Sequence, residues 1–225
     1  MLDWLGANLT YVIWAVVVGA GYLLGAFPSG LVIGRWVAGI DLRRFGSGNI
    51  GATNALRVLG RWPSLAVLLV DTGKAAIAVT IARLVGTPDF IWAASAVAVV
   101  AGHCWSAYIG FRGGKGVACA LGAVLAFFWP AGVIGAALAA PVMWLTRYVS
   151  VGSLAGTIAG TLVILGAVAL GFLPLGSALF IFVAACVVYR HRDNLKRLRD
   201  GTERKLGQSV KSMKSATSTS VSISR

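Results

Sequence analysis

The stretch YVIWAVVVGAGYLLGAFPSGLVIG, residues 11–34, contains no charged side chain. An apolar run of about 18 or more residues is long enough to cross the ~30 Å hydrocarbon core of a membrane as a helix. Of the 225 residues, 58% are hydrophobic and 12% are charged, about half the charged fraction of a typical soluble domain. The sequence therefore predicts an all-α integral membrane protein. Further apolar runs follow at roughly 62–85, 90–109, 116–129, 131–146, 152–172 and 174–189.

Two counts of spans compete. Pro130, Pro174 and the turn at 87–89 divide the apolar runs, which gives seven spans. The runs at 116–129, 131–146 and 174–189 are short for a bilayer, so merging the first two at Pro130 gives a six-span alternative.

The distribution of Lys and Arg favours seven spans. Of the 20 basic residues, five lie in 35–61, two in 110–116, one at 147 and ten from Arg190 onward. With seven spans and an outside N-terminus, all these loops share one side of the membrane, and the excess of Lys and Arg makes that side cytoplasmic. We therefore expect seven transmembrane helices, with the N-terminus outside and the C-terminus cytoplasmic. Six spans would put Arg147 and the tail opposite the earlier basic loops.

The net charge of +13 comes largely from the tail, which has no aromatic residue after Tyr189 for base stacking. We therefore expect contact with anionic membrane lipids and no nucleic-acid partner. The three cysteines form no CxxC pair, so neither a metal site nor a disulfide framework is expected. Residues 1–206 are expected to form one membrane domain, and the Ser/Lys-rich stretch 207–225 is predicted to be disordered.

Three polar segments interrupt the apolar runs. Polar segment 1 is GSGNIGATNALR (46–57), polar segment 2 is GHCWSAYIGFRGGKG (102–116), and polar segment 3 is RHRDNLKRLRDGTERK (190–205). Each combines Arg or Lys with small polar residues, and the first two are rich in Gly. Backbone amides exposed by glycine, together with cationic side chains, are suited to holding phosphate.

Polar segment 1 spells the dinucleotide fingerprint GxGxxG, but it follows a membrane span and not a strand, so a dinucleotide fold is not supported. Asn49, Thr53 and Arg57 have a spacing that would share one helix face. Arg57 is predicted to bind phosphate, with a lipid-headgroup or topological role as the alternative. Ser47 and Asn49 are also plausible helix caps.

Asp71 and Lys74 lie inside the run at 62–85, where ionisable residues are costly and usually face the interior of a bundle. Either they form an internal ion pair, or Asp71 orients Lys74 or an Arg toward a polar cavity.

Polar segment 2 ends in Gly-Gly-Lys-Gly, which is not a P-loop because Gly116 stands where Ser or Thr is required. We expect a phosphate cradle made of backbone amides and the ammonium of Lys115. His103 is either a hydrogen-bonded anchor at the membrane interface or a group that donates to an oxyanion or moves protons.

In polar segment 3, His191 and Asn194 share a face where the last span ends. Ser150 and Ser153, at the start of the run 152–172, either cap that helix or line the same cavity.

Taken together, the segments resemble the bacterial acyl-phosphate:glycerol-3-phosphate acyltransferase (PlsY) family. The resemblance is carried by GSGNIGATNALR at 46–57, DTGK at 71–74, GH at 102–103 with FRGGKGVA at 111–118, and RHRDNLKRLRDGTERKL at 190–206. The stretch CWSAYIG at 104–110 departs from the family pattern, in which a proline and a more apolar run are expected.

The resemblance implies a seven-span fold in the bacterial cytoplasmic (inner) membrane, with an active site that faces the cytoplasm. It implies transfer of a fatty acyl group from acyl phosphate to the 1-hydroxyl of glycerol 3-phosphate, which gives lysophosphatidic acid and inorganic phosphate in phospholipid synthesis. No cofactor is implied. The catalytic set carried over is Ser47, Arg57, Lys115, His191 and Asn194. The substrate-binding set is Asn49, Asn54, Lys74, His103, Gly113, Gly114, Gly116, Ser150 and Ser153.

Acyl phosphate is already activated, so positioning and electrostatic stabilisation can carry most of the rate, without a covalent acyl-enzyme. The base is left open between His191, His103 and the substrate's own phosphate. No paired carboxylates for a metal are visible, and activity in EDTA is expected. The alternatives are a transporter or channel for a phosphorylated solute and a non-catalytic lipid-binding scaffold, both of which explain the basic loops less specifically.

Overall fold

The computed structural model describes residues 2–208, and every regular element among them is helical. The predicted disorder of the tail concerns residues that lie almost entirely outside this range. The helices are α1 (Leu2–Ala26), α2 (Ser29–Ala38), α3 (Ala52–Leu59), α4 (Arg61–Leu84), α5 (Asp89–Cys104), α6 (Val117–Phe127), α7 (Trp129–Thr146), α8 (Val149–Ala169), α9 (Phe180–Arg190) and α10 (Arg192–Arg199). Three single 3-10 turns connect them: η1 (Leu42–Arg44), η2 (Ala107–Ile109) and η3 (Leu175–Leu179).

Helix boundaries follow the breakers in the sequence. The predicted run at 11–34 is not one helix, because the chain breaks at Phe27 and Pro28 between α1 and α2. Proline lacks an amide hydrogen and clashes with the preceding turn, which explains the break. The runs at 116–129 and 131–146 are two helices that pack against each other, because the extended Phe128 separates α6 from α7. The two runs are therefore separate helices and not one continuous helix through Pro130.

Five segments of the described chain are long and apolar enough to cross a membrane: Asn8–Ala38, Arg61–Leu84, Asp89–Ile109, Trp129–Thr146 and Val149–Ala169. A sixth arises if Leu175–Arg190 and the helix after it, bent by 51°, count as one. Helix α6, with 11 residues, rises only about 16 Å. The chain is a helical protein with several potential membrane spans.

Small residues let the long helices approach closely. A Cβ on Gly25 of α1 would overlap the carbonyl oxygen of Val99 in α5, and one on Gly102 would overlap the carbonyl of Tyr22. Gly122 of α6 lies equally close to the backbone of Thr72 in α4. In a bilayer such packing replaces the hydrophobic driving force between helices, since lipid is as apolar as the helix faces.

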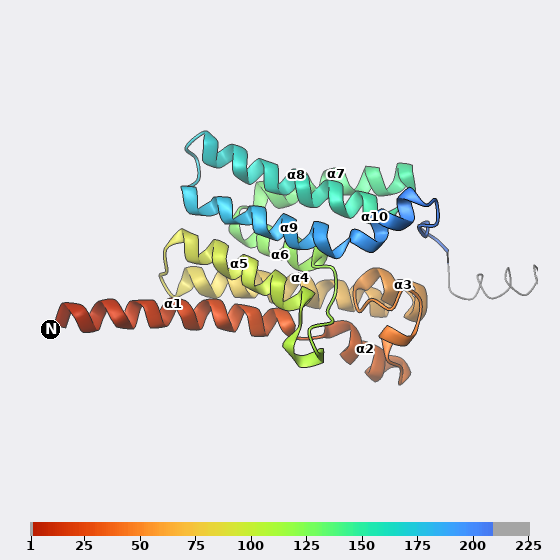
Figure 1. Cartoon of the computed structure of the whole chain (residues 1–225), viewed down its shortest axis with the longest axis horizontal. Coiled ribbons are helices and arrows are strands. Elements are labelled where there is room, and N and C mark those ends of the chain that lie inside the picture. The colour runs from red at the N-terminus through yellow and green to blue at the C-terminus, as the bar shows by residue number, and fades with distance from the viewer. Residues whose placement is uncertain (1, 209–225) are drawn as a thin grey trace, which may run out of the picture.

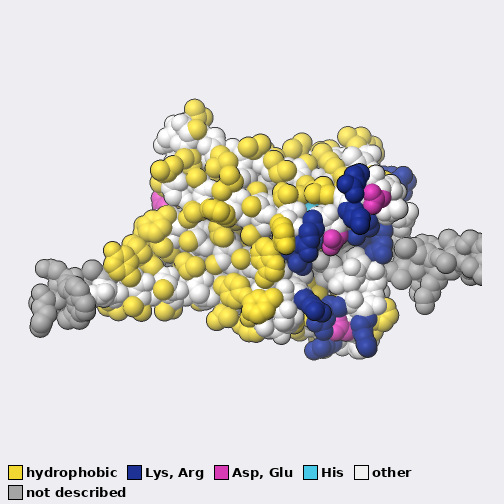
Figure 2. Space-filling model, in the orientation of Figure 1, with side chains coloured by type: hydrophobic (Ala, Val, Ile, Leu, Met, Phe, Trp, Pro, Cys, Tyr) yellow, Lys and Arg dark blue, Asp and Glu magenta, His cyan; other side chains and the backbone are white. Residues whose placement is uncertain are grey.

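The three polar segments lie at one end of the bundle. Figure 1 shows α2, α3 and α10 at this end, with the loop after α5 beside them, while the N-terminal half of α1 extends to the other end. On the face seen in Figure 2, Lys and Arg side chains gather at the same end and the rest of the surface is mainly hydrophobic. The amphiphilic shape is that of a bundle with one end in water and its body in lipid.

A pair of glycines in α1 tests the close helix contact. Gly25→Ala should lower the free energy of unfolding by about 1–3 kcal/mol, because the added methyl overlaps the α5 backbone. Gly19→Ala in the same helix meets nothing within 4 Å and should leave stability unchanged or slightly raised. Thermal unfolding in detergent measures both, and equal transitions for the two variants would contradict the contact.

Candidate active site

Polar segment 1 folds around the side chain of Asn54. This side chain is 1% exposed. Its Oδ1 accepts a hydrogen bond from the Ser47 amide at 2.8 Å, and its Nδ2 donates to the carbonyls of Leu42, Phe45 and Asn49 at 3.2, 3.1 and 2.8 Å. The amide is thus fully used in holding the loop. Substrate binding by Asn54 remains a prediction, and the structure gives the residue a scaffold role.

Helix α3 begins at Ala52, so Asn49 lies before it and does not share a helix face with Thr53 and Arg57, contrary to expectation. The Oδ1 of Asn49 instead accepts from the Gly51 amide at 2.9 Å, which closes the turn before the helix. Ser47 is exposed, and its hydroxyl lies 3.4 Å from the Asn49 amide. Arg57, in the last turn of α3, interacts electrostatically with Arg204, Glu203 and Arg197 of polar segment 3.

Polar segment 2 is fastened to α5 and α9. The amides of Gly113 and Gly114 donate to the carbonyls of Cys104 and His103, and Arg190 donates to the carbonyls of both glycines at 2.7 and 2.9 Å. Two of the four amides expected to cradle phosphate are therefore already bonded to protein. This leaves the Lys115 ammonium and the amides that follow Gly114 for the predicted cradle.

The close packing of His103 requires a glycine at position 114. A Cβ at this position would overlap the imidazole Nε2 of His103. Gly116 has φ +82°, a left-handed conformation that only glycine adopts without strain, and it leads into α6. Both glycines thus shape the loop that presents Lys115.

A buried polar network lies beneath this loop. Lys74 Nζ lies 2.7 Å from Asp71 Oδ1, 2.8 Å from the Phe27 carbonyl and 3.2 Å from His103 Nδ1. The Ser29 hydroxyl donates to Asp71 at 2.7 Å. The internal ion pair that the sequence allowed is present, and it includes His103. The network joins the break between α1 and α2, helix α2, helix α4 and helix α5 below the loop Gly113–Gly116, which we call the glycine loop.

Asp71, His103 and Cys119 have potential metal-ligand atoms within 4.8 Å of one another. The Lys74 ammonium already neutralises the carboxylate at ion-pair distance, and a metal ion there would be repelled by it. The donor set is better suited to the ion pair than to a metal.

Polar segments 2 and 3 meet at Glu203. Lys115 Nζ donates to Asn194 Oδ1 at 2.5 Å, and Asn194 Nδ2 donates to Glu203 Oε1 at 2.6 Å. The Ser150 hydroxyl donates to the same oxygen at 2.8 Å, and Arg197 Nε donates to Oε2 at 2.8 Å. We call Lys115, Ser150, Asn194, Arg197 and Glu203 the glutamate cluster.

The cluster sets the ionisation of its members. Burial lowers the pKa of Lys115 to about 8, with nearby Arg197 and Arg57 lowering it further and Glu203 opposing. Burial also lowers the pKa of Arg57, and the positive charge of Arg204 is the second-largest cause of this lowering. Burial alone would raise the pKa of Glu203, but hydrogen bonds from Asn194, Arg197 and Ser150 outweigh it and lower the pKa. One carboxylate therefore balances several cations.

Two further predicted residues lie beside the cluster. His191 is 2% exposed and its Nδ1 lies 2.8 Å from the Val187 carbonyl, where only a protonated Nδ1 makes a hydrogen bond. Burial, and after it the nearby Lys115 ammonium, lower the pKa of His191 to about 4, so its imidazole is neutral near pH 7. Ser153 is buried one turn after Ser150, and its carbonyl accepts from Thr157. The structure thus brings Arg57, Lys115, Ser150, His191 and Asn194 to one place.

Sequence reasoning assigned no role to Glu203 or Arg190. Glu203 lies in the quoted GTERK stretch, where it is one acid among many bases. Arg190 reads as an ordinary basic anchor at the end of a span, yet it holds the Gly113–Gly114 turn. An acid within a strongly basic segment is the feature that could have identified Glu203.

The fold and the site define a helical membrane protein with a cluster of cationic side chains at one end of its bundle. The family model described as glycerol-3-phosphate acyltransferase matches residues 13–201. The chain belongs to the glycerol-3-phosphate acyltransferase family.

Individual relatives of the chain carry the same family description. The glycerol-3-phosphate acyltransferase of Synechococcus sp. (strain CC9902) is 40% identical over 201 residues, which cover 88% of this chain and 97% of the relative. A glycerol-3-phosphate acyltransferase of Thermus thermophilus is 43% identical over 204 residues, which cover 90% of this chain and 98% of the relative.

The fold also matches solved structures. The crystal structure of PlsY, an integral membrane glycerol 3-phosphate acyltransferase, in its glycerol 3-phosphate form has a TM-score of 0.80 and 35% identity, covering 86% of this chain and 96% of that one. The lysophosphatidic acid form gives a TM-score of 0.78 and 34% identity, covering 86% and 95%. This chain is accordingly a multi-pass membrane protein of the same fold.

The glutamate cluster predicts a stability effect. Glu203→Gln should lower the free energy of unfolding by roughly 1–3 kcal/mol, because glutamine has an amide NH2 in place of one acceptor oxygen and lacks the negative charge that Arg197 and Lys115 face. Asp200→Asn, at an exposed acid in the same segment, is the matched control and should have little effect. Thermal unfolding in detergent compares them, and an unchanged transition for Glu203→Gln would contradict the role of the cluster.

Proposed function

We propose that this protein transfers a fatty acyl group from acyl phosphate to the 1-hydroxyl of glycerol 3-phosphate. The hydroxyl oxygen attacks the acyl carbonyl carbon, a new ester C–O bond forms, and the C–O bond to phosphate breaks. The products are lysophosphatidic acid and inorganic phosphate, and the hydroxyl proton leaves with a base or a phosphate oxygen. The observation that carries the proposal is the convergence of Arg57, Lys115, His191 and Asn194 around Glu203, in a chain of this family.

Recognition rests on cations. Both substrates carry phosphate, and Arg57 and Lys115 approach the same carboxylate from α3 and from the glycine loop. A planar guanidinium binds phosphate through two parallel hydrogen bonds, and an ammonium adds a point charge. A phosphate dianion that enters the site would take over from Glu203 as the main negative charge acting on Lys115. The site is therefore organised for anions before substrate arrives.

The chemistry needs little covalent help from the protein. Acyl phosphate has a good leaving group, so holding the two reactants in line and stabilising charge on the carbonyl oxygen can supply the rate. Because Nδ1 of His191 faces the Val187 carbonyl, its Nε2 is the ring atom left to accept a proton. His103 is held in the Asp71–Lys74 network, with its Nε2 against Gly114. Of the two histidines, His191 is the better placed base.

We propose seven membrane crossings, by α1, α4, α5, α6, α7, α8 and α9, with the N-terminus outside and the active site facing the cytoplasm of a bacterial inner membrane. Two observations support this topology. Successive long helices alternate in direction, and the polar segments share one end (Figure 1). The basic side chains at that end agree with a cytoplasmic location. Helix α6 needs its flanking residues, or a locally thin bilayer, to complete its crossing.

An assay of phosphate release tests the reaction. Purified protein should release phosphate only when glycerol 3-phosphate and palmitoyl phosphate are both present. Arg57→Ala and Lys115→Ala should each lower kcat/KM by roughly 10- to 100-fold, the worth of a charged hydrogen bond. Arg199→Ala, at an exposed position of the same segment, should retain activity. Wild-type turnover in both active-site variants would overturn the proposal, and solute flux in liposomes without chemistry would indicate a transporter.

The pH profile tests Lys115. Its ammonium form is present below its pKa of about 8 and is lost as the pH rises through that value. Because kcat/KM reports ionisations of the free enzyme, it should fall as the pH rises above about 8. Lys115→Arg keeps the charge at all these pH values, so its decline should move to higher pH. The same decline in both proteins would show that another group titrates.

A further inference from the structure

A pocket of about 630 Å³ lies between α2, η1 and η2, away from the glutamate cluster. Its lining includes two arginines, Arg35 and Arg43, and apolar or aromatic side chains. None of its lining residues belongs to the glutamate cluster or to the Asp71–Lys74–His103 network. The proposed reaction leaves this pocket without a role.

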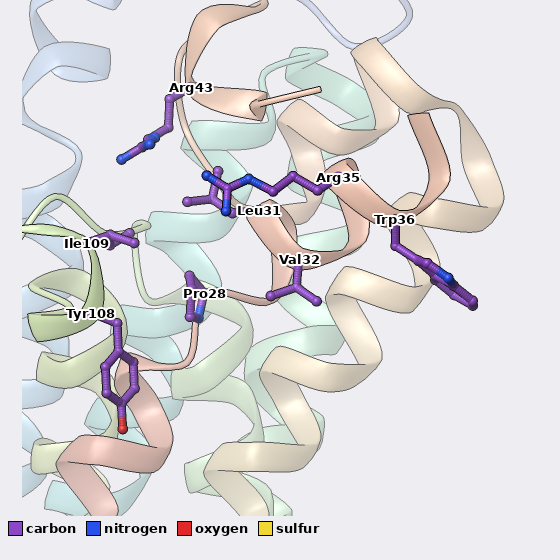
Figure 3. A pocket seen from close by; sticks show the side chains of 8 residues that line it. All are labelled: Pro28, Leu31, Val32, Arg35, Trp36, Arg43, Tyr108 and Ile109. Carbon is purple, nitrogen blue, oxygen red and sulfur yellow. The ribbon is translucent and has the colours of Figure 1, made fainter. Parts of the chain in front are cut away.

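Both guanidiniums extend into the same space. In Figure 3 they lie on the Leu31 side of the pocket, and both point across it, toward the loop that carries Ile109. Arg43 is also bound to Asp41, with contacts of 3.0, 3.2 and 2.6 Å. Within residues 2–208 the guanidinium of Arg35 has no hydrogen bond or salt bridge, although its charge adds to that of Arg43 in lowering the pKa of Asp41 to about 2. With Asp41 counted, the mouth of the pocket keeps one uncompensated positive charge.

The rest of the pocket is suited to lipid. Val32 and Trp36 line it from the outer face of α2 and are 45% and 86% exposed. Helix α1 alone rises about 37 Å over its 25 residues, more than the ~30 Å hydrocarbon core. Helix α1 is thus long enough to cross the core without α2, and an exposed Trp beside Arg, as found in α2, is typical of the headgroup region.

The two halves of the pocket together specify its ligand. We infer that it binds an anionic diacyl phospholipid of the surrounding leaflet. The lipid phosphate lies against Arg35 and Arg43, and the acyl chains run along Val32 and Trp36 toward the hydrocarbon. A free phosphate ion would use the arginines and leave the apolar wall in water. A neutral lipid would leave the Arg35 charge unmatched, so charge complementarity and the apolar wall point to the same class of molecule.

Tyr108 adds an aromatic ring to the pocket. It lines the pocket from η2 and lies in the CWSAYIG stretch that departs from the family pattern. Its ring stands on the membrane side of the two arginines, with its hydroxyl pointing away from them (Figure 3). An aromatic ring at this depth packs against the glycerol region of a lipid and leaves the phosphate to the guanidiniums.

Native mass spectrometry of the full chain tests the inference. Protein delipidated in neutral detergent is mixed with phosphatidylglycerol or with phosphatidylcholine of the same acyl chains, and retained lipid is measured. Wild type should retain more phosphatidylglycerol. Arg35→Gln should reduce this retention roughly fivefold, and Arg35→Gln with Arg43→Gln should reduce it further. Arg44→Gln, a neighbouring exposed arginine outside the pocket, is the matched control and should behave as wild type.

Asp41→Asn gives a change of opposite sign. Asparagine can still accept from the Arg43 amide at the start of η1, while the loss of the carboxylate raises the pocket charge by one. Retention of phosphatidylglycerol should therefore rise, and a fall to the level of Arg35→Gln would contradict the inference. Unchanged thermal unfolding and turnover for the four variants would show that they are folded.

Several results would overturn the inference. Equal retention of the two lipids would show that charge is not recognised, and an Arg44→Gln loss equal to that of Arg35→Gln would show only general surface charge. Competition by inorganic phosphate as effective as that by phosphatidylglycerol would identify a phosphate site without lipid. If Arg35→Gln instead lowered kcat/KM for acyl phosphate in neutral detergent, the pocket would belong to the substrate path.

Discussion

The carboxylate of Glu203 is the interaction on which the cationic end of this bundle depends. Its two oxygens accept hydrogen bonds from Ser150, Asn194 and Arg197, which come from two different helices. Asn194 links this carboxylate to Lys115, since Asn194 also accepts a hydrogen bond from the Lys115 ammonium, 79 positions earlier in the chain. Without one acid at this point, several positive charges would repel one another in a partly buried place. The same acid keeps those charges close enough together to receive phosphate.

In the glycine loop, backbone hydrogen bonds fix one half and the other half carries the cationic side chain. Its first two amides and carbonyls are bonded to α5 and to Arg190, so this half of the loop is fixed by the protein itself. The remaining half carries Lys115 and leads into α6. A rigid base with one cationic side chain at its edge is the arrangement that pre-organises a site for anions. The glycines are needed for close approach to His103 as much as for contact with a ligand.

Much of the fold could be read from the sequence, because apolar length and breakers are local properties. The run predicted at 62–85 became α4 at Arg61–Leu84, and the run at 131–146 became α7 at Trp129–Thr146. The break at Pro28 was missed, since proline inside an apolar run either kinks or ends a helix and only packing decides which. The start of α3 was missed because the Asn49 side chain closes a turn where helical spacing suggested a helix.

The site was predictable as a set of segments and less so as a set of contacts. Arg57, Lys115 and Asn194 were chosen for their chemistry, and the structure places them together. The scaffold role of Asn54 and the central place of Glu203 depend on partners that only the folded chain brings near; Ser150 and Glu203 are 53 positions apart. Sequence spacing carries no information about such pairs. The function could be inferred before the contacts because the resemblance extends over all three polar segments.

The buried network of Asp71, Lys74 and His103 has a consequence for how the chain is assembled during synthesis. Helix α4 carries both members of its ion pair one turn apart, so it can leave the translocation machinery already neutralised. The other partners of this ion pair, Ser29 and the Phe27 carbonyl, precede α4 in the chain and are therefore synthesised before it. His103 is made later and completes the set. Both charged groups of this ion pair therefore have a partner already synthesised when α4 enters the hydrocarbon.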